Sequence, residues 1–363
     1  MKRLTLISLQ KTGGAALDVI EFSNALCKEK IVHNLVISSG NELIEHFVPD
    51  PARTFIKVPT FASNTASFLF WTVTLIRPVY LLVILLRVQS SYYLSTHFHP
   101  WLFMVHLASR ITGRPWMYAI HESPFWEKES RGDISTTLEK KYLRQADTVF
   151  CYSHFIAQNL KGNLPGKKII ALPLGAYTEG YNIAKKHPAL IPVKKHPRIL
   201  YVGRIEAHKG LETLIESASQ LASGKQPFEL LIAGRGTLPE SALTKPYIIV
   251  YNKWLSIEEF GALTQSADII VLPYNSASQS GIIAWANAVG RPTVITNVGG
   301  LPEQIIDNVT GFCVPSRDPA AITEKLDLLL SNENKRKVMA EAAKELGKKL
   351  SWQEVARLVT EES

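Results

Sequence analysis

Short apolar runs alternate with longer segments of helical length along the whole chain. Runs of four or five residues rich in Val, Ile and Leu are typical of buried parallel strands, and the segments between them are long enough for crossover helices. The pattern restarts near residue 198. We therefore predict an α/β fold of two doubly wound, Rossmann-like domains. The predicted strands are 4–8, 34–38, 92–95, 116–120, 148–151 and 169–172, then 198–202, 229–233, 248–251, 269–272 and 293–296.

A stretch with three prolines and two Lys-Lys pairs interrupts this alternation. Such a composition is typical of an exposed linker. We predict a first domain at 1–180, a linker at 181–197, a second domain at 198–350 and a final helix at 351–363 that packs back on the first domain. The two domains should face each other across a cleft into which the carboxyl ends of both sheets point, where this architecture usually binds ligands.

The composition, with 46% apolar and 20% charged residues among 363, favours a soluble globular protein. Three widely spaced cysteines indicate neither a disulfide framework nor a zinc site, so a reducing cytoplasm is the expected compartment. The first ten residues hold too short an apolar run for a signal peptide and are predicted to form a strand. Residues 68–88 are apolar and long, but Arg77 and Pro78 in the middle favour two packed or interfacial helices over a membrane span.

Positive charge is concentrated in the first half of the chain. Residues 1–178 hold 19 Lys and Arg against 12 Asp and Glu, or +7, whereas residues 179–363 hold 21 against 20, or +1. No acidic residue lies between 51 and 121, where Arg alternates with apolar and aromatic side chains such as Phe68, Phe70 and Trp71. This region suits peripheral contact with an anionic membrane surface or a lipid-linked phosphate; a buried core with solvated Arg at its rim is equally compatible. No recognisable nucleic-acid-binding module is present.

Two loops of the second domain are candidates for binding a diphosphate. The small polar residues 276–280 precede a helix that should open at Gly281, so free backbone N–H groups and a helix dipole would be available to a phosphate. Arg204 and Lys209 bracket another strand-to-helix loop, as in a diphosphate clamp. Ordinary crossover loops without a ligand are the alternative. In the first domain, Gly13 and Gly14 permit close backbone approach, but the loop lacks the three-glycine dinucleotide fingerprint.

Histidines follow two predicted strands of the first domain. His97 and His99 come after one strand, and His121, followed by Glu122, comes after the next. A histidine at the carboxyl end of a strand is well placed for catalysis or binding. We expect His121 to be catalytic and His97, His99 and Glu122 to contact an acceptor.

A series of motifs extends over nearly the whole chain. They are GGA at 13–15, His121, RQAD at 144–147 leading to Ser153, PLG at 173–175, VGRIEAHKG at 202–210, IAGRG at 232–236, SADIIVLPY at 266–274, GRPTVIT at 290–296, GGLPE at 299–303 and TGFCVPSRD at 310–318. With these motifs the chain resembles the group 1 retaining glycosyltransferases of the two-domain glycosyltransferase-B fold. The resemblance is densest in the second half.

This resemblance implies a nucleotide-diphosphate sugar donor held mainly by the second domain and an acceptor recognised by the first. Arg204 and Lys209 would neutralise the diphosphate, with the backbone of Gln279, Ser280 and Gly281 and the loop of Gly13 and Gly14 at its oxygens. Asn252, Lys253 and Trp254 lie where the family contacts the base, and His121 matches the histidine that reaches the donor sugar. No Asp-x-Asp is present, so no metal or other cofactor is expected. Front-face displacement, aided by the leaving phosphate, is the mechanism implied.

The chain departs from the family where two glutamates usually stand eight positions apart. Alignment on Gly290 and Pro292 places Ala277 and Trp285 at those positions, so both carboxylates are missing. A subset of the family has a Ser-Gln-Ser-Gly loop there, as this chain does. Ribose binding would then come from Asn287, from Gln279 or from stacking on Trp285.

We therefore expect a cytoplasmic, metal-independent retaining hexosyltransferase that uses a UDP- or GDP-sugar and a glycan or lipid-linked glycan acceptor in polysaccharide biosynthesis, with peripheral membrane contact through residues 51–121. The missing glutamates leave open a non-catalytic nucleotide-sugar-binding or partner subunit. A sugar-nucleotide epimerase of the same fold is the other alternative.

Overall fold

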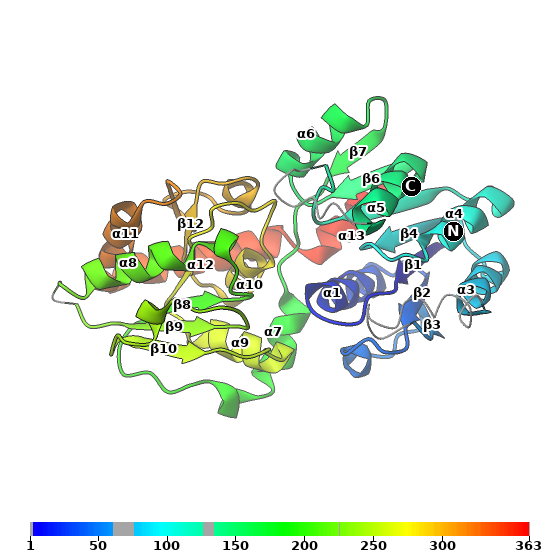
Figure 1. Cartoon of the computed structure of the whole chain (residues 1–363). Helices are drawn as coiled ribbons and strands as arrows, with labels where there is room; N and C mark the ends of the chain where they lie inside the picture. Colours follow the sequence, from blue (N-terminus) through cyan, green and yellow to red (C-terminus); the bar gives the residue numbers. More distant parts are fainter. Residues whose placement is uncertain (1–2, 61–75, 126–133, 225, 363) are drawn as a thin grey trace. The chain divides into compact units, whose positions relative to one another are not determined.

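The computed structural model describes residues 3–60, 76–125, 134–224 and 226–362. These residues form two compact units, one of residues 1–173 together with 352–363 and one of residues 174–351. Each unit contains one sheet, and all strand pairs in both sheets are parallel (Figure 1). The predicted fold of two Rossmann-like α/β units is confirmed.

The first unit has a seven-stranded sheet in the order β3-β2-β1-β4-β5-β6-β7. The order reverses between β1 and β4, which is the point where ligands usually bind in open α/β sheets. Strands β1, β2, β4 and β5 are buried over their full lengths, as expected for a parallel sheet covered on both faces. The strands are β1 Leu4–Ser8, β2 His33–Ser38, β3 Arg53–Val58, β4 Tyr92–Thr96, β5 Trp116–Ile120, β6 Thr148–Cys151 and β7 Lys168–Ala171.

Helices on this sheet bury apolar faces in a core centred on Trp116, Tyr118 and Val105. Arg114 donates to the carbonyl oxygen of Val88 at 2.9 Å and so links the segments that follow α4 and α3. The helices are α1 Gly14–Lys28, α3 Ile76–Arg87, α4 Leu102–Thr112, α5 Ile134–Gln145, α6 His154–Asn163 and α13 Trp352–Glu361, with a short η1 at Ile44–His46.

The second unit has a six-stranded sheet in the order β10-β9-β8-β11-β12-β13. Its order reverses between β8 and β11, so the loops after these two strands meet at the switch point. The strands are β8 Arg198–Val202, β9 Glu229–Ala233, β10 Ile248–Tyr251, β11 Ile269–Leu272, β12 Thr293–Thr296 and β13 Gly311–Val314.

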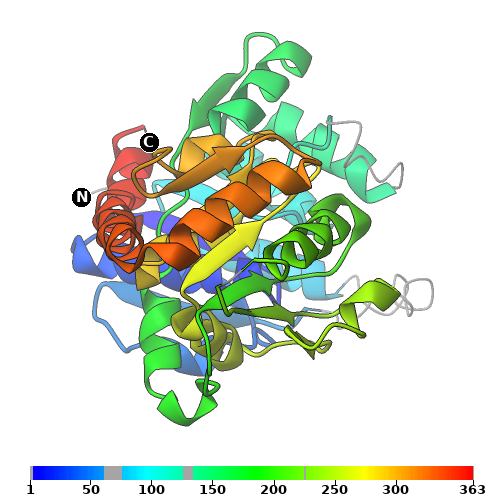
Figure 2. The same cartoon turned by 90° about the vertical axis from the view of Figure 1, so that its left-hand side faces the viewer.

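Alternate residues of this sheet enter two separate cores. Tyr201 packs with α8 and α11, which lie together on one face (Figure 2), whereas Leu200 and Val202 pack with α9 and α10 on the other. The helices are α7 Thr178–Lys185, α8 Leu211–Leu221, α9 Ile257–Ser266, α10 Gly281–Val289, α11 Pro319–Ser331 and α12 Glu333–Lys349, with short 3-10 turns η3 Pro188–Leu190, η4 Ala207–Lys209, η5 Glu240–Ala242 and η6 Leu301–Gln304.

The strand pattern was read correctly from the sequence except at two places. All eleven predicted strands are present within one residue at each end, but β3 and β13 were not predicted. Both are edge strands, and β3 leaves most of its side chains partly or fully exposed. Polar side chains such as Lys57 therefore break the continuous apolar run by which the inner strands were recognised.

The segment predicted as a linker, 181–197, lies within the second unit. Helix α7 packs against α9, and buried Arg198 donates to the carbonyl oxygens of Pro192 and Val193 at 3.1 and 2.9 Å. The crossing from the first unit therefore lies at 173–174. Helix α13 packs on α1 of the first unit, where Trp352 makes edge contacts with Phe22 and Tyr152.

Of residues 68–88, predicted to form two helices, the structure describes a single helix, α3 Ile76–Arg87. The aromatic residues Phe68, Phe70 and Trp71 lie outside the described residues. No helix among the described residues is long and apolar enough to cross a membrane.

Candidate functional site

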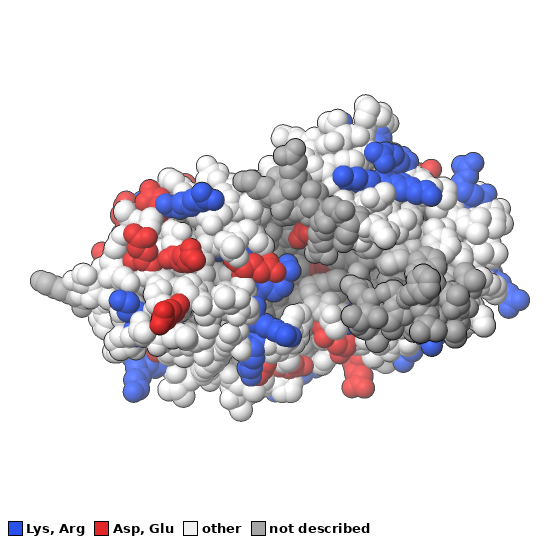
Figure 3. Space-filling model, in the orientation of Figure 1, with Lys and Arg blue, Asp and Glu red and all other residues white. Residues whose placement is uncertain are grey.

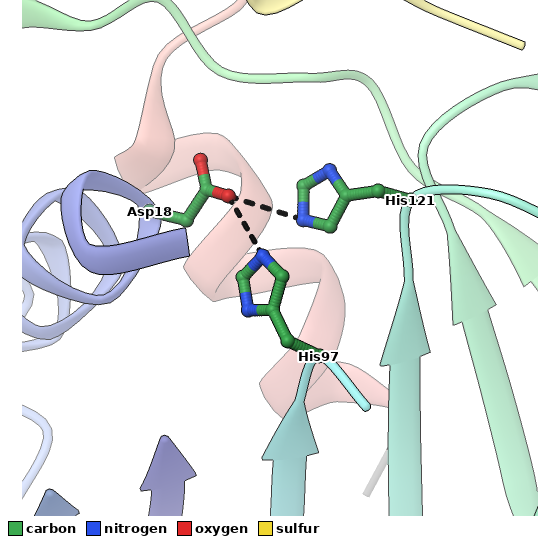
Figure 4. A group of neighbouring side chains, drawn as sticks. All are labelled: Asp18, His97 and His121. Atoms are coloured by element: carbon green, nitrogen blue, oxygen red, sulfur yellow. Dashed lines mark hydrogen bonds and ion pairs between the residues drawn. The ribbon is translucent and has the colours of Figure 1, made fainter. Parts of the chain in front are cut away.

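Three side chains converge at the switch point of the first sheet. Asp18 projects from the second turn of α1, His97 follows β4 and His121 follows β5 (Figure 4). The Nε2 atom of His97 is 3.0 Å and that of His121 is 3.2 Å from the same carboxylate oxygen, Oδ2 of Asp18. A carboxylate oxygen only accepts hydrogen bonds, so the hydrogen-bonded His97 carries its proton on Nε2.

The ring of His121 is stacked between two others. Its centroid lies 4.6 Å from that of His97 and 4.4 Å from that of Tyr152. Burial lowers the pKa of His121 to about 4, although Asp18 acts to raise it, and His97 lowers it further. His121 is therefore neutral near pH 7 and is suited to form hydrogen bonds without carrying a charge.

The same three atoms resemble a metal-ligand set, since all lie within 4.8 Å of one another. The ring orientations disfavour that use. An imidazole nitrogen binds an ion through a lone pair in the ring plane, and the planes of His97 and His121 are stacked only 10° from parallel. One ion cannot lie in both planes, so the geometry favours a hydrogen-bonded network around Asp18.

The backbone at His97 is held in an uncommon conformation. Its φ is +72°, a region that non-glycine residues adopt at a cost of about 1 kcal/mol or more. Its Nδ1 is buried and has no hydrogen-bond partner among the described residues. Such strain persists only where the surroundings require it, which is common at functional sites.

The other two residues expected at the acceptor lie in different settings. His99 is buried, its Nδ1 accepts from the backbone N–H of Trp101 at 3.1 Å, and burial lowers its pKa to about 3. This contact orders the turn that leads into α4, so His99 has a local structural role. Glu122 is exposed directly after His121.

The glycine loop after β1 is already engaged by an acid. The N–H of Gly13 donates to Oε1 of Glu42 at 2.7 Å. A carboxylate at this position would repel a diphosphate, so the predicted phosphate contact requires Glu42 to move. Open space adjoins the Cα atoms of Gly13 and Gly14, and the φ of +74° at Gly13 is what calls for glycine there.

In the second unit, the loops after β8 and β11 are joined at the switch point. The N–H of Asn275 donates to the carbonyl oxygen of His208 at 2.8 Å, and Nζ of Lys209 lies 3.9 Å from the ring centroid of Tyr274. A cation over an aromatic face is held by the ring quadrupole. Arg204 is exposed in the same loop, with Nη1 3.0 Å from Glu206. The predicted clamp residues thus share one short loop, Lys209 held on Tyr274 and Arg204 paired with an acid.

Gly210 lets these loops approach each other. Its φ is +66°, and a Cβ atom there would lie 1.9 Å from the carbonyl oxygen of Pro273. Neither the conformation nor the space admits another residue without displacement of the backbone. The position of Lys209 in this loop therefore depends on Gly210.

The N-terminus of α10 is held by a glutamine that the sequence reasoning missed. Gln304 accepts from the N–H of Ser280 at 2.7 Å and donates to its carbonyl oxygen at 3.0 Å. The hydroxyl of Ser280 caps the helix by accepting from the N–H of Ile282. The N–H of Ser280, predicted to bind phosphate, thus already has a partner, while Gly281 begins the helix beside the ring of Tyr177.

The residues predicted near the base follow β10. The side chain of Asn252 pairs with both the N–H and the carbonyl oxygen of Gly236, at 3.1 and 3.0 Å, and thereby joins the loops after β9 and β10. Lys253 is paired with Glu259 at 2.5 Å. The ring of Trp254 is 55% exposed and is the one of the three with free surface for stacking.

Trp285 is part of the core. It is 4% exposed and packs against Phe260 and Tyr177, with ring centroids 5.2 and 6.0 Å away. The ring therefore has little surface for a ribose. Asn287 is also buried, and its amide donates to the carbonyl oxygen of Gln304 at 3.4 Å.

Four residues with central positions were not predicted: Asp18, Tyr152, Tyr274 and Gln304. Asp18 did leave a signal, because an acidic residue lies between the apolar Leu17 and Val19 in the helix after the glycine loop. The others could not be recognised without knowing which distant loops meet.

Comparison with known proteins identifies the second unit. Residues 182–346 match the family described as glycosyl transferases group 1. The chain carries a group 1 glycosyltransferase domain. The resemblance predicted from the motifs is thereby confirmed, and the domain occupies most of the second unit.

Curated relatives of this glycosyltransferase domain include enzymes with different sugars in their names. The chain is 30% identical over 178 residues to D-inositol 3-phosphate glycosyltransferase of Corynebacterium urealyticum. These aligned residues make up 44% of this chain and 41% of that protein. It is 25% identical over 264 residues to alpha-D-kanosaminyltransferase of Streptomyces kanamyceticus, covering 66% and 68%. The chain spans about half the length of the first curated relatives it matches, 41% and 56%.

Solved structures share the fold along the whole chain. Sucrose-phosphate synthase from Thermosynechococcus elongatus has a TM-score of 0.74 at 17% identity, covering 99% of this chain and 98% of that one. HepE from Anabaena, solved in complex with UDP-glucose, has a TM-score of 0.74 at 13% identity, covering 100% and 99%. At these identities the similarity establishes the fold alone, which is that of the glycosyltransferase-B proteins.

Proposed function

We propose that the chain is a retaining glycosyltransferase that moves a hexose from a UDP- or GDP-sugar to a glycan or lipid-linked glycan. The observation that carries the proposal is the match of residues 182–346 to group 1 glycosyl transferases. Relatives named as glycosyltransferases and a similar fold that binds UDP-glucose support a nucleotide-sugar donor.

The donor diphosphate is assigned to the switch point of the second unit. Lys209 over Tyr274, exposed Arg204 and the N-terminus of α10 supply positive charge and a helix dipole. These groups stabilise the leaving diphosphate without a metal ion, and its oxygen deprotonates the acceptor during front-face displacement. Binding requires Arg204 to exchange Glu206 for a phosphate oxygen, which is likewise a charge-assisted partner.

The acceptor is assigned to the first unit, where Asp18 orients His121 and His97. A neutral His121 fits the expected contact with a hydroxyl group of the donor sugar. A neutral imidazole carries no charge and has one nitrogen that donates a hydrogen bond and one that accepts. The finer parts of the proposal are a cytoplasmic site of action, peripheral contact with the membrane and a role in polysaccharide biosynthesis.

A panel of UDP- and GDP-sugars in a binding assay and a transfer assay tests this function. Arg204→Ala or Lys209→Ala should lower transfer at least about tenfold, the loss expected for one charge-assisted contact to the diphosphate. The matched control is Lys245→Ala, which removes an exposed cation elsewhere in the same unit. Normal transfer by both clamp variants, or no binding of any sugar nucleotide, would sink the proposal.

One observation favours a second candidate, a non-catalytic nucleotide-sugar-binding subunit. Ala277 and Trp285 stand where the family usually has glutamates, and Trp285 is buried. Donor binding without turnover, with activity appearing only when a second protein is added, would support this candidate. Reaction of the donor without an acceptor would instead indicate an epimerase.

A further inference from the structure

Helix α3 of the first unit presents an apolar face to solvent. Ile76, Val79 and Tyr80, spaced as neighbours on one side of the helix, are 77%, 47% and 48% exposed. The opposite side is fully buried, with Leu81 and Leu85 in the core. A helix that is apolar all round is normally covered on every side. Within the part of the chain that the structure describes, the outer side of α3 has no such cover.

Helix α4, which packs against α3, has the same character. Phe103, Leu107 and Ile111 follow each other at four-residue intervals along its outer side and are 37%, 41% and 59% exposed. Its inner side places Val105 and Ala108 in the core. The two helices therefore give the first unit one exposed apolar surface, which we name the α3/α4 face. It consists of Ile76, Val79, Tyr80, Phe103, Leu107 and Ile111.

Helix α12 of the second unit gives the contrast, since its outer side is mostly charged. The outer side of α12 carries Glu341, Lys344 and Lys348, all exposed. Scattered single apolar residues on a surface need no explanation, but a contiguous apolar surface marks an interaction site.

The Asp, Glu, Lys and Arg positions within α3 and α4 themselves are all arginines. Arg87 and Arg110 are exposed beside it, and neither forms an ion pair among the described residues. No acidic residue lies between 51 and 121. The pKa of His106, on the outer side of α4, is lowered first by partial burial and then by Arg110; Lys141 adds to this effect, while Asp147 opposes it. Figure 3 shows several Lys and Arg side chains on the part of the surface formed by the first unit.

We propose that the α3/α4 face docks on an anionic lipid bilayer, with its apolar side chains in the interface and Arg87 and Arg110 at lipid phosphates. Apolar area and cations on one face are the two features that such binding combines. A second copy of the chain is a poorer occupant, because self-pairing would place the unpaired arginines of both copies against each other. The inference rests on the proposed function and deepens it, since it favours the lipid-linked glycan among the proposed acceptors.

Vesicle co-sedimentation of the full chain tests the proposal without donor or acceptor. The chain is expected to bind vesicles that contain phosphatidylglycerol as well as phosphatidylcholine, and to bind vesicles of phosphatidylcholine alone only weakly. Binding to the anionic vesicles should weaken as the salt concentration rises. The double variant Arg87→Gln/Arg110→Gln should bind about thirtyfold more weakly, since each cation near an anionic surface contributes about 1 kcal/mol. Lys245→Gln/Lys349→Gln, which removes two exposed cations of the second unit, should leave binding unchanged.

The apolar contribution is tested by Ile76→Gln/Ile111→Gln against a matched control, Leu243→Gln/Val338→Gln, in which the replaced side chains are 65% and 64% exposed on the second unit. The first pair should lose most of the vesicle binding and the control should keep it. All four residues are more than half exposed, so folding measured by circular dichroism should be unchanged.

Equal binding of the α3/α4 variants and their controls would overturn the proposal, as would no vesicle binding by the unaltered chain. Concentration-dependent dimerisation that Ile76→Gln/Ile111→Gln abolishes, without vesicle binding, would assign the face to a second copy instead. Because none of these variants touches the donor loops, sugar-nucleotide binding serves as a separate readout. A chain that binds vesicles but no sugar nucleotide would refute the proposed function and leave this inference standing.

Discussion

Lowering the pH from 8 to 5 should destabilise the first unit through its buried histidines. Burial lowers the pKa of His33 to about 4, that of His99 to about 3 and that of His121 to about 4. In the unfolded chain each has a pKa near 6.5. Between these values the unfolded state binds protons that the folded state does not, so the stability is fully present above pH 6.5 and is lost as the pH falls towards the folded pKa.

The size of the effect follows from the same values. At pH 5 each of the three histidines contributes a loss of about 2 kcal/mol relative to pH 8, and together they amount to about 6 kcal/mol. That loss is comparable with the whole stability of a typical domain, about 5–15 kcal/mol. The first unit should therefore be close to unfolding at pH 5.

Urea unfolding, monitored by hydrogen exchange and mass spectrometry, measures the stability of the first unit separately from that of the second. Peptides from β4 and β5 report on the first unit, and peptides from β8 and β9 report on the second, which contains none of these three buried histidines. Replacement of His33 by Gln should reduce the loss between pH 8 and pH 5 by about 2 kcal/mol, whatever it does to stability at pH 8. Equal unfolding midpoints of the first unit at pH 5 and pH 8 would refute the reasoning.

Three further substitutions test the two switch points. Asp18→Asn should lower kcat at least about tenfold while donor binding is retained, because a neutral amide accepts more weakly than a carboxylate from Nε2 of His97 and removes the negative charge beside His121; unchanged turnover would contradict the positioning role. Gly210→Ala should cost more than about 2 kcal/mol of unfolding free energy, from its positive φ and the contact with Pro273, as measured in urea. Gln304→Ala leaves the backbone groups of Ser280 buried without their partner and should cost roughly 2–4 kcal/mol by the same measurement.

The fold could be predicted because inner strands of a parallel sheet must be apolar throughout. Ile269–Leu272 is such a run, and its bounds were read directly from the sequence. The crossing between the units was harder, because prolines and lysines in 181–197 indicate a surface segment but not which core it packs on. Arg198, which holds that segment to the second unit, is a charged residue that gave no sign of being buried.

For the candidate functional site, the sequence indicated which loops take part but not which distant side chains contact them. Glycines and cations after strands identified the turns at 13–14 and 203–210, since conformation and charge are local properties. The contacts that decide their chemistry join distant residues, as in Asp18 with His97 and Gly13 with Glu42. Trp285 shows the same limit: its position in the motif suggested a ribose contact, but its packing on α9 is a tertiary property.

The return of α13 to the first unit has a consequence for how the protein is made. Trp352 lies against Phe22 and Tyr152, so one wall of the first unit is supplied by residues that follow the entire second unit. Domains generally fold in the order in which the ribosome releases them. Here residues 174–351 form an uninterrupted unit that can close as soon as it has emerged, while the earlier segment waits with its aromatic surface uncovered. Helix α13, which is synthesised after the entire second unit, thus completes the first unit, and a nascent-chain chaperone would have the most exposed surface to bind before it emerges.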